Sequence, residues 1–337
     1  MKTCELSAAA QSLALRLEAV DYDSLPISAY NKRYIRSMRP AFAYYLEIYA
    51  ACLRRGLSAT GQPPASLVMV DYGGGSGFLS MLAKEVGIGR VIYVDLNPLS
   101  VEAVTVLKQH TGCGPDDILS GDTAVLAAWC AARQVKPQLL VATDLIEHVY
   151  DLKPFFAALA GINERLSMIF TTASTPYNPW VKRRLRRFMK ECESGGQASP
   201  GYYAKREQFI RTCRPSFSDE MVERWSRNTR GLTYPDIEEA IGENRLPVPG
   251  DAFNTCDPAT GNWAERILPI DAYRTLLAAS RFSLAVGKGH YNTHRRNRFA
   301  AFLCRCANVV IRRSGKAGFL LSPYILLYCS RKDAGAV

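Results

Sequence analysis

Short apolar runs alternate with amphipathic stretches through the middle of the chain. The run at residues 67–70 leads into a glycine-rich turn, a helical pattern over residues 78–86, and a second apolar run that ends at Asp95. Two apolar runs around a helical segment are typical of a βαβ unit in a parallel sheet. Residues 66–98 therefore predict the unit around which an α/β domain is built.

The alternation continues beyond Asp95. The pair Asn97-Pro98 is a helix-start signal. Helices are predicted at residues 98–109, 124–133, 153–160 and 270–280, and strands at 117–120, from 139, and at 167–171, 283–287 and 323–329. Together with the first two strands, these elements predict a Rossmann-like, doubly wound α/β sheet of seven strands.

Two stretches fall outside this alternation. Apolar residues recur at helical spacing in the first part of the chain, which predicts an N-terminal helical cap at residues 1–60. Within it, the aromatic and basic segment Tyr30–Arg36 is either a helix packed on the domain or a lid over the site. Residues 172–267 interrupt the pattern and predict a helical insertion, so that the main domain comprises residues 61–171 and 268–332.

The turn after the first strand reads Asp71-Tyr-Gly73-Gly74-Gly75-Ser76-Gly77. Glycines allow positive φ angles and a close approach of the backbone to a ligand. An acidic residue at the end of the second strand, here Asp95, stands where such folds bind ribose hydroxyls. The turn and Asp95 together predict a nucleoside-binding site.

The glycine spacing excludes two common nucleotide sites. A dinucleotide turn needs G-x-G-x-x-G, but the third position falls on Phe78 or Ser80. A phosphate-binding loop needs a lysine at its end, and none follows Gly77. A carboxylate at Asp71 would repel a pyrophosphate, whereas it suits a ligand that carries an ammonium group.

The pattern Asp-x-Gly-x-Gly-x-Gly resembles motif I of the class I S-adenosylmethionine-dependent methyltransferases. The sequence Glu147-His148-Val149 after the fourth strand resembles one group of them, which includes the quinone-pathway O-methyltransferases. The resemblance covers residues 66–171 well and 268–332 loosely. It implies an antiparallel last strand, a substrate-recognition role for residues 172–267 and the cofactor S-adenosyl-L-methionine.

The resemblance also implies roles for single residues. Asp71 would face the methionine amino group, and Asp95 would hold the ribose hydroxyls. Asp122 would accept a hydrogen bond from the adenine amino group, or would cap the helix that follows it. The full set of cofactor-binding residues implied in this way is Asp71, Gly73, Gly74, Gly75, Gly77, Asp95, Leu96, Asp122, Thr123 and Asp144.

The catalytic candidates are His148 and His290. Asp144, Glu147 and His148 follow a strand, and ligands of such sheets collect at the carboxyl ends of the strands. A histidine there can take a proton from the acceptor, although it can equally fix the loop by hydrogen bonds. The function that we expect is O-methylation of a small-molecule, sugar or lipid-linked acceptor. RNA-directed methyl transfer and a non-catalytic cofactor-binding module are the alternatives.

The composition of the chain limits the classes of partner that it is expected to bind. The formal net charge of +11 predicts an anionic partner. The sequence lacks the Asn-Pro-Pro-Tyr/Phe motif of amino-directed nucleic-acid methyltransferases, which argues against nucleic acid. Ten cysteines without C-x-x-C pairs and the lack of a signal peptide predict a cytoplasmic protein. No residue cluster calls for a metal, and no apolar run reaches the length of a membrane span.

Each of two basic segments allows two interpretations. Lys182–Lys190 is either a solvated helix face or a surface that binds lipid headgroups, sugar phosphates or RNA. His294–Arg313 is basic and amphipathic, which predicts peripheral contact with an anionic membrane surface or a helix packed on the domain with its arginines outward.

Overall fold

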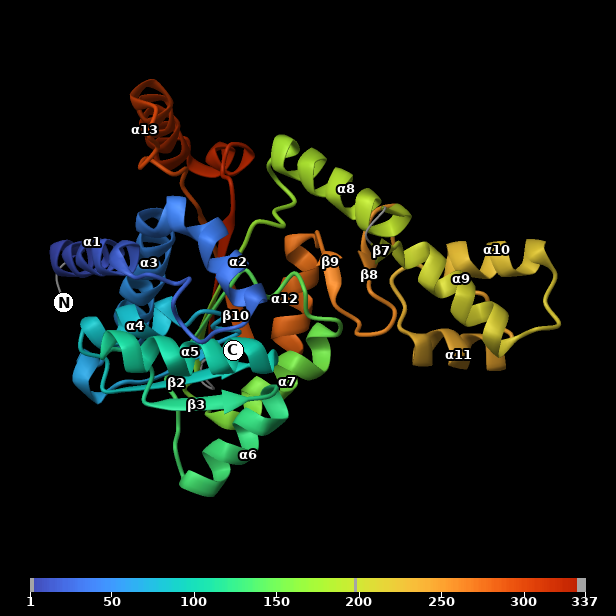
Figure 1. Ribbon diagram of the computed structural model, residues 1–337, viewed down its shortest axis with the longest axis horizontal. Helices are drawn as coiled ribbons and strands as arrows, with labels where there is room; N and C mark the ends of the chain where they lie inside the picture. The colour runs from blue at the N-terminus through green and yellow to red at the C-terminus, as the bar shows by residue number, and fades with distance from the viewer. Residues whose placement is uncertain (1–2, 197–198, 332–337) are drawn as a thin grey trace, which may run out of the picture.

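The computed structural model describes residues 3–196 and 199–331 and contains a seven-stranded sheet of strand order β10-β11-β5-β4-β1-β2-β3 (Figure 1). Its strands are β1 Val68–Tyr72, β2 Arg90–Asp95, β3 Asp117–Ser120, β4 Leu139–Thr143, β5 Ser167–Thr172, β10 Phe282–Lys288 and β11 Ile325–Arg331. Strand β11 pairs antiparallel with both β5 and β10, and the other neighbours pair in parallel. The expected seven-stranded sheet with an antiparallel last strand is confirmed. Lys332, at the predicted end of the main domain, lies outside the described residues.

Helices cover both faces of the sheet because alternate residues of each strand point to opposite sides. Met69 and Val91 belong to the core on one face, and Val70 and Ile92 to the core on the other. The first face is covered by α1 Thr3–Ala19, α2 Ala29–Met38, α3 Phe42–Thr60, α4 Phe78–Glu85 and α5 Pro98–Thr111, and the second by α6 Thr123–Arg133, α7 Leu152–Ile162 and α12 Ile270–Ala279.

The three N-terminal helices do not form a separate layer. The ring of Phe42 in α3 packs edge-on against that of Phe78 in α4, with 5.2 Å between the ring centroids. In α2, the Asn31 side chain donates a hydrogen bond of 2.8 Å to the Leu99 carbonyl of α5. Helix α3 thus belongs to the layer that packs on the sheet, while α2 is tied to α5.

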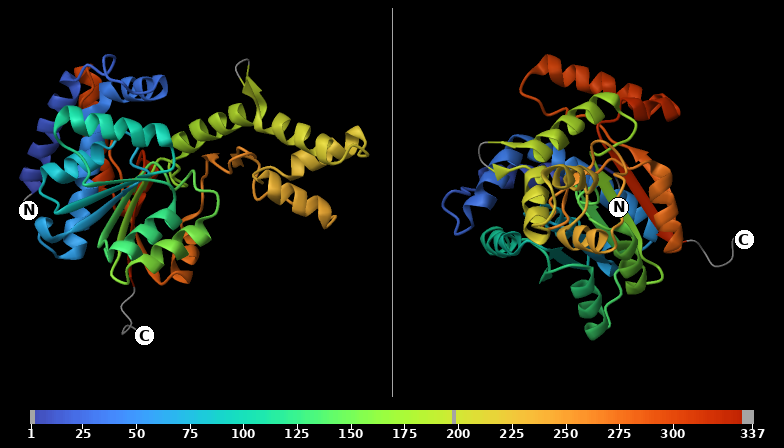
Figure 2. Two further views of the ribbon diagram at one scale, coloured as in Figure 1. Left: turned by 60° about the horizontal axis from the view of Figure 1, so that its bottom comes forward. Right: turned by 90° about the vertical axis from the view of Figure 1, so that its right-hand side faces the viewer.

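The segment between β5 and α12 leaves the sheet and extends to one side of the molecule (Figure 2, left). It contains α8 Pro179–Ser194, the short pairs β6 Gly195–Gly196 with β7 Ser199–Pro200 and β8 Thr255–Cys256 with β9 Trp263–Glu265, and helices α9 Tyr202–Cys213, α10 Asp219–Asn228 and α11 Tyr234–Gly242. Helices α9 to α11 enclose an apolar core of their own around Ile210, Val222 and Ile237.

A buried ion pair joins the near and far parts of this insertion. Arg206 of α9 is fully buried, and its Nη2 lies 2.5 Å from Oε1 of Glu193 in α8. Thr255 of β8 donates to the other carboxylate oxygen of Glu193 at 2.7 Å. Burial alone would raise the pKa of Glu193, but the hydrogen bonds and charge of Arg206 hold it below its ordinary value.

The C-terminal part adds one helix that stands away from the sheet. Helix α13 spans Arg298–Arg313 and is followed by the 3₁₀ helix η3 Gly315–Leu320. The helix begins inside the basic segment His294–Arg313, because Asn297 caps it by accepting a hydrogen bond of 3.0 Å from the Ala300 amide. Within the described ranges, no helix is both long and apolar enough to cross a bilayer.

Candidate functional site

The turn between β1 and α4 needs its glycines for two physical reasons. Gly73, Gly75 and Gly77 have φ angles of 68°, 53° and 74°, in the left-handed region that side chains disfavour. A Cβ at Gly73 would also lie 1.9 Å from Cδ1 of Leu145, and one at Gly77 would lie 2.3 Å from Cγ2 of Val104. The backbone therefore passes close to both neighbours.

Strand β2 holds this turn in place with two side chains. The Gly75 amide donates to Oδ2 of Asp95 at 2.9 Å, and the hydroxyl of Tyr93 donates to the Gly75 carbonyl at 2.7 Å. The other oxygen of Asp95 accepts from the Asn97 amide at 2.8 Å. The two features that the sequence singled out, the glycine turn and Asp95, are thus brought together by a direct hydrogen bond.

The side of Gly75 that faces α2 is less crowded than that of its neighbours. A Cβ built at Gly75 would meet only the ring of Tyr34, at 3.8 Å. Gly74 differs, because its Cβ would lie 2.6 Å from the Tyr93 ring and 2.9 Å from Cγ of Asp71. Helix α2 therefore covers the turn with an aromatic ring. Arg36, at the end of the segment predicted as a packed helix or a lid, pairs with Asp23 at 2.7 Å.

Asp71 is only 2% exposed, and one of its oxygens faces helix α4. Its Oδ2 accepts hydrogen bonds from the Ser80 amide at 3.0 Å and from the Ser80 hydroxyl at 2.6 Å. Burial raises the pKa of Asp71 to about 7, against the two Ser80 hydrogen bonds, and the charge of Asp95 raises it further. Asp71 thus anchors the first turn of α4, a role that the sequence did not indicate.

The rim beyond β2 and β3 carries the residues expected around the adenine. Leu96 has an exposed side chain, and Thr123 begins α6. Oδ1 of Asp122 accepts from the amides of Ala124 at 2.9 Å and Val125 at 3.2 Å. Asp122 therefore is the N-cap of α6, and its contact with adenine stays a prediction.

At the end of β4, Asp144 adopts a left-handed backbone conformation with φ of 56°. Such angles are uncommon outside glycine and concentrate at functional sites. The Asp144 amide donates to the Thr171 carbonyl of β5 at 2.9 Å. Burial, and after it the charge of Asp144, raises the pKa of Tyr34. The Asp144 carboxylate thus faces the same space beneath α2 as the glycine turn.

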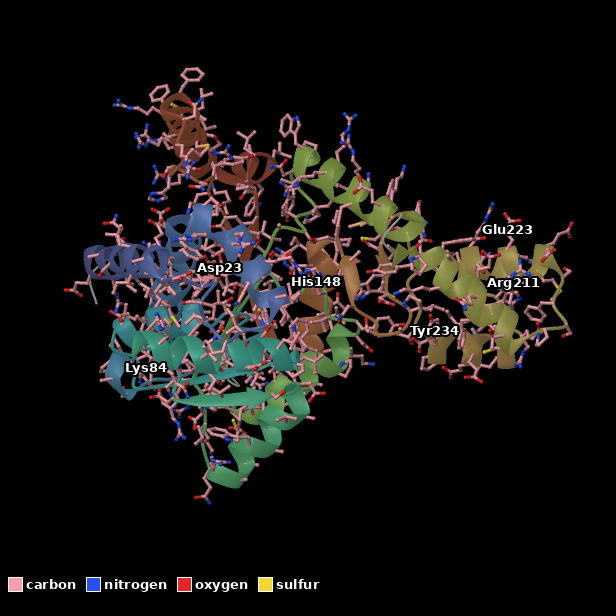
Figure 3. The ribbon with its side chains drawn as sticks, viewed as in Figure 1. Asp23, Lys84, His148, Arg211, Glu223 and Tyr234 are labelled. Carbon is pink, nitrogen blue, oxygen red and sulfur yellow. The ribbon has the colours of Figure 1, made fainter. Side chains whose placement is uncertain are left out.

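His148 lies where the sheet meets the insertion (Figure 3). Its Nδ1 is 2.8 Å from the Trp263 carbonyl of β9, and the Trp263 amide donates to the His148 carbonyl at 3.2 Å. The Trp263 ring also stacks on Tyr150, with 6.0 Å between centroids. The return strand of the insertion is therefore fastened to the loop after β4, and a proton on Nδ1 leaves Nε2 as the acceptor atom of His148.

Two carboxyl groups interact beside this loop, Glu147 and Glu265, and the sequence analysis missed Glu265. Glu147 is fully buried, and neither of its carboxylate oxygens has a hydrogen-bond partner among the described residues. Burial, then the charges of Asp144 and Glu265, raise the pKa of Glu147 well above its ordinary value. Glu265 of β9 accepts a hydrogen bond of 2.5 Å from the Ser174 hydroxyl. No sequence pattern could place Glu265 beside Glu147, because its position depends on the path by which the insertion returns to the sheet.

His290 lies apart from His148. It follows β10, which β11 and β5 separate from β4 in the sheet. Its Nδ1 is 2.9 Å from the Tyr324 hydroxyl, its carbonyl accepts from Tyr44 at 2.7 Å, and its Nε2 is 3.8 Å from Glu47. The two candidate catalytic histidines thus occupy different places. In the described part of the chain, no group of three or more His, Cys, Asp or Glu residues could hold a metal ion.

No family model matches the chain. The ribosomal protein L11 methyltransferase of Burkholderia mallei (strain NCTC 10229) is 36% identical over 77 residues, which make up 21% of this chain and 25% of that protein. The enzyme of the same name from Burkholderia thailandensis is 30% identical over 96 residues, 27% of this chain and 31% of that protein. The chain thus spans between a quarter and a third of the length of these curated relatives.

Solved structures align over nearly the whole chain, but at low similarity. The magnesium protoporphyrin IX methyltransferase of Synechocystis PCC 6803 with bound SAH has 13% identity and a TM-score of 0.41, covering 98% of this chain and 97% of that one. Geranyl diphosphate methyltransferase in complex with GPP and sinefungin has 15% identity and a TM-score of 0.40, covering 98% and 99%. Identities and TM-scores this low say nothing about activity. The fold is therefore assigned from the strand order, and the candidate site from its own geometry.

Proposed function

We propose that this protein is an S-adenosylmethionine-dependent methyltransferase. The observation behind this proposal is the glycine turn that is hydrogen-bonded to the acidic residue ending the neighbouring strand. A Cβ at Gly75 would meet nothing closer than the Tyr34 ring at 3.8 Å, and Asp95 ends β2 at the same edge. The remaining lone pairs of the Asp95 carboxylate can accept hydrogen bonds from a ribose. The turn itself, residues 71–77, contains no Lys or Arg that could bind a pyrophosphate.

The residues present fit the cofactor. Gly73, Gly75 and Gly77 would line its path along the turn, with Gly74 beneath. Asp95 would accept from the ribose hydroxyls, and the exposed Leu96 would cover one side of the adenine, near Asp122 and Thr123. Asp71 and Asp144 would face its methionine end, where an ammonium group favours ionised carboxylates. When bound, the cofactor supplies an electrophilic methyl group on a sulfonium with a good leaving group.

The chain's own residues position the acceptor. In-line displacement mainly requires alignment of the attacking atom. In our proposal, Nε2 of His148 takes the proton of an acceptor hydroxyl, while the Trp263 carbonyl orients the ring through Nδ1. The second candidate, His290, is held by Tyr324 and is assigned no step. An oxygen acceptor on a small molecule, a sugar or a lipid-linked compound remains the class that we propose.

Calorimetry with S-adenosylhomocysteine tests the site. Asp95→Ala should weaken binding by on the order of 1–3 kcal/mol, because charge-assisted hydrogen bonds in a half-buried site are lost. Asp117→Ala, which removes a carboxylate of β3 that pairs with Arg90 away from the turn, should leave the affinity unchanged. Equal affinities for all three proteins would refute the assignment of the site.

Labelled cofactor tests the reaction. A cell extract incubated with methyl-labelled S-adenosylmethionine should yield a labelled product, whose identification gives the acceptor. His148→Gln should lower kcat by about 10²-fold or more while leaving cofactor affinity unchanged. Tight cofactor binding without a labelled product from any extract would favour the non-catalytic alternative.

A further inference from the structure

Helix α13 presents its apolar side to solvent. Phe299, Phe302, Leu303, Cys306 and Val310 recur at helical spacing, and all five side chains are exposed. Phe299 is 69% exposed and Phe302 56%. This set, here called the outward stripe, is more apolar than the face that packs on the protein. The buried positions of the helix are Ala301, Asn308 and Ile311, which lie on its opposite side.

The orientation of α13 is fixed by specific contacts. The side chain of Asn308 accepts from the Tyr291 amide at 2.7 Å and donates to the Tyr291 carbonyl at 2.9 Å. Nζ of Lys288 donates to the Gly315 carbonyl just after the helix at 3.0 Å. These bonds hold the inner face against the domain, so the outward stripe faces solvent in the folded protein. Figure 1 shows α13 standing away from the sheet.

The charge around the stripe is predominantly positive. Residues 272–331 contain no Asp or Glu, while α13 and its approach contain Arg295, Arg296, Arg298, Arg305, Arg312 and Arg313. Within the described ranges, no ion pair joins any of these arginines to a carboxylate. A cavity of about 1030 Å³ beside the helix is lined by Arg54 and Arg55 and by one carboxylate, Glu47, which pairs with His294 at 2.7 Å.

Helix α8 extends this surface. Its start is joined to the segment after α13, because the Tyr177 and Phe319 rings pack at 5.0 Å and the Asn178 side chain donates to the Ser322 carbonyl at 3.0 Å. Trp180 in the first turn of α8 is 68% exposed. Residues 165–190 again lack acids and include six cations in α8. Figure 2 (right) shows α8 and α13 at the same end of the molecule.

We propose that the outward stripe of α13, together with the start of α8, docks on an anionic lipid bilayer. A helix with aromatic and aliphatic residues on one face and arginines beside them is the form that lies in a membrane interface. Tryptophan prefers the headgroup level, and each nearby cation is attracted to anionic lipid. This proposal is independent of methyl transfer, although it suits a lipid-linked acceptor.

Other occupants fit the chemistry less well. A second copy of the chain would bring two arginine-rich surfaces of the same sign together, which costs electrostatic energy. Nucleic acid would attract the arginines and could stack on the aromatic rings. Nucleic acid would not bury the aliphatic side chains of Leu303 and Val310, which belong to the outward stripe. A bilayer matches both the apolar and the charged parts.

Vesicle co-sedimentation of the full chain tests this proposal. Vesicles of phosphatidylcholine with about one-third phosphatidylserine should bind the protein at low salt, and phosphatidylcholine alone should not. Phe299→Ser/Phe302→Ser should reduce binding by about tenfold or more. Leu15→Ser, an exposed apolar side chain on α1, is the matched control and should bind as the unaltered chain does. Arg305→Gln/Arg312→Gln/Arg313→Gln should weaken binding, whereas Arg224→Gln/Arg227→Gln/Arg245→Gln in the insertion should not.

A spectroscopic readout reports the geometry of docking. The emission of Trp180, taken as the difference between the chain and Trp180→Phe, should shift to shorter wavelength with phosphatidylserine vesicles, because the ring leaves water. Absence of binding at low salt overturns the proposal, and so does binding that Phe299→Ser/Phe302→Ser leaves unchanged. A dimer in light scattering that this variant dissociates, or retention of RNA in place of vesicles, would assign the surface to another partner.

Discussion

At the scale of single residues, two opposing effects act on the charge of Asp71. Its carboxylate receives two hydrogen bonds from Ser80, which favour the charged form, but its burial disfavours charge more strongly. The pKa of about 7 in the folded chain exceeds the ordinary value of 3.8. The folded state therefore binds a proton between these pH values when the unfolded state does not, and stability falls as the pH rises from about 4 to about 7.

We predict that Asp71→Asn removes this pH dependence, because the amide stays neutral and can still accept from Ser80. Without ligand, the variant should match the unaltered chain near pH 4 and exceed its free energy of unfolding at pH 8 by on the order of 2–4 kcal/mol. Urea unfolding across this pH range measures the effect. Asp122→Asn, which keeps a good N-cap, is the control. Parallel pH profiles for all three proteins would contradict the prediction.

At the scale of elements, the glycine turn shows which physical demands require glycine at a position. Gly77 stands at a φ of 74° and would place a Cβ 2.3 Å from Cγ2 of Val104 in α5. Gly112 has a similar φ of 66°, but nothing lies within 4 Å of its Cβ position. Substitutions at these two glycines therefore distinguish the free-energy cost of the backbone conformation from that of a steric clash with a neighbouring side chain.

We predict that Gly112→Ala lowers the free energy of unfolding by about 1 kcal/mol, the usual cost of a left-handed alanine. Gly77→Ala should cost about 2–3 kcal/mol more, since overpacking adds to it. In the Val104→Ala background, the extra cost of Gly77→Ala should fall. Chemical denaturation of the four variants provides the measurement. Equal losses at the two glycines would show that close approach to α5 is not what requires glycine at the turn.

The elements that sequence could predict are those whose pattern is local. The strands and helices from β1 to β5, the antiparallel β11 and the turn at Gly73–Gly77 follow from periodicity, glycine chemistry and resemblance. Glu265 could not be predicted beside Glu147, because the position of β9 depends on how the whole insertion returns. The amphipathic pattern of α13 was visible as well. Its periodicity could not tell whether the apolar side faces the core or solvent, since both give the same pattern.

At the scale of the whole molecule, the insertion has an apolar core of its own and is joined to the rest of the chain at several places. Trp263 contacts His148 beside the site, and the Tyr150 hydroxyl donates to Asp236 of α11. The buried pair of Arg206 with Glu193 lies within the insertion, where it joins α9 to α8. The core around Ile210 and Trp225 is separate from the two cores that cover the sheet. Loss of the buried pair should therefore loosen the outer helices without disturbing the cofactor site.

We predict that Arg206→Met makes the insertion sensitive to proteolysis, because the charge of Glu193 stays buried with Arg230 as its only remaining cation among the described residues. The local cost should be about 3 kcal/mol, since removal of the fully buried partner leaves the Glu193 charge to Arg230 alone. Affinity for S-adenosylhomocysteine should not change. Adding Glu193→Gln should restore protection, because the neutral amide no longer needs a cation. Reduced cofactor affinity in step with faster cleavage would show instead that the insertion and the sheet unfold as one unit, so that the separate cores do not confer separate stability.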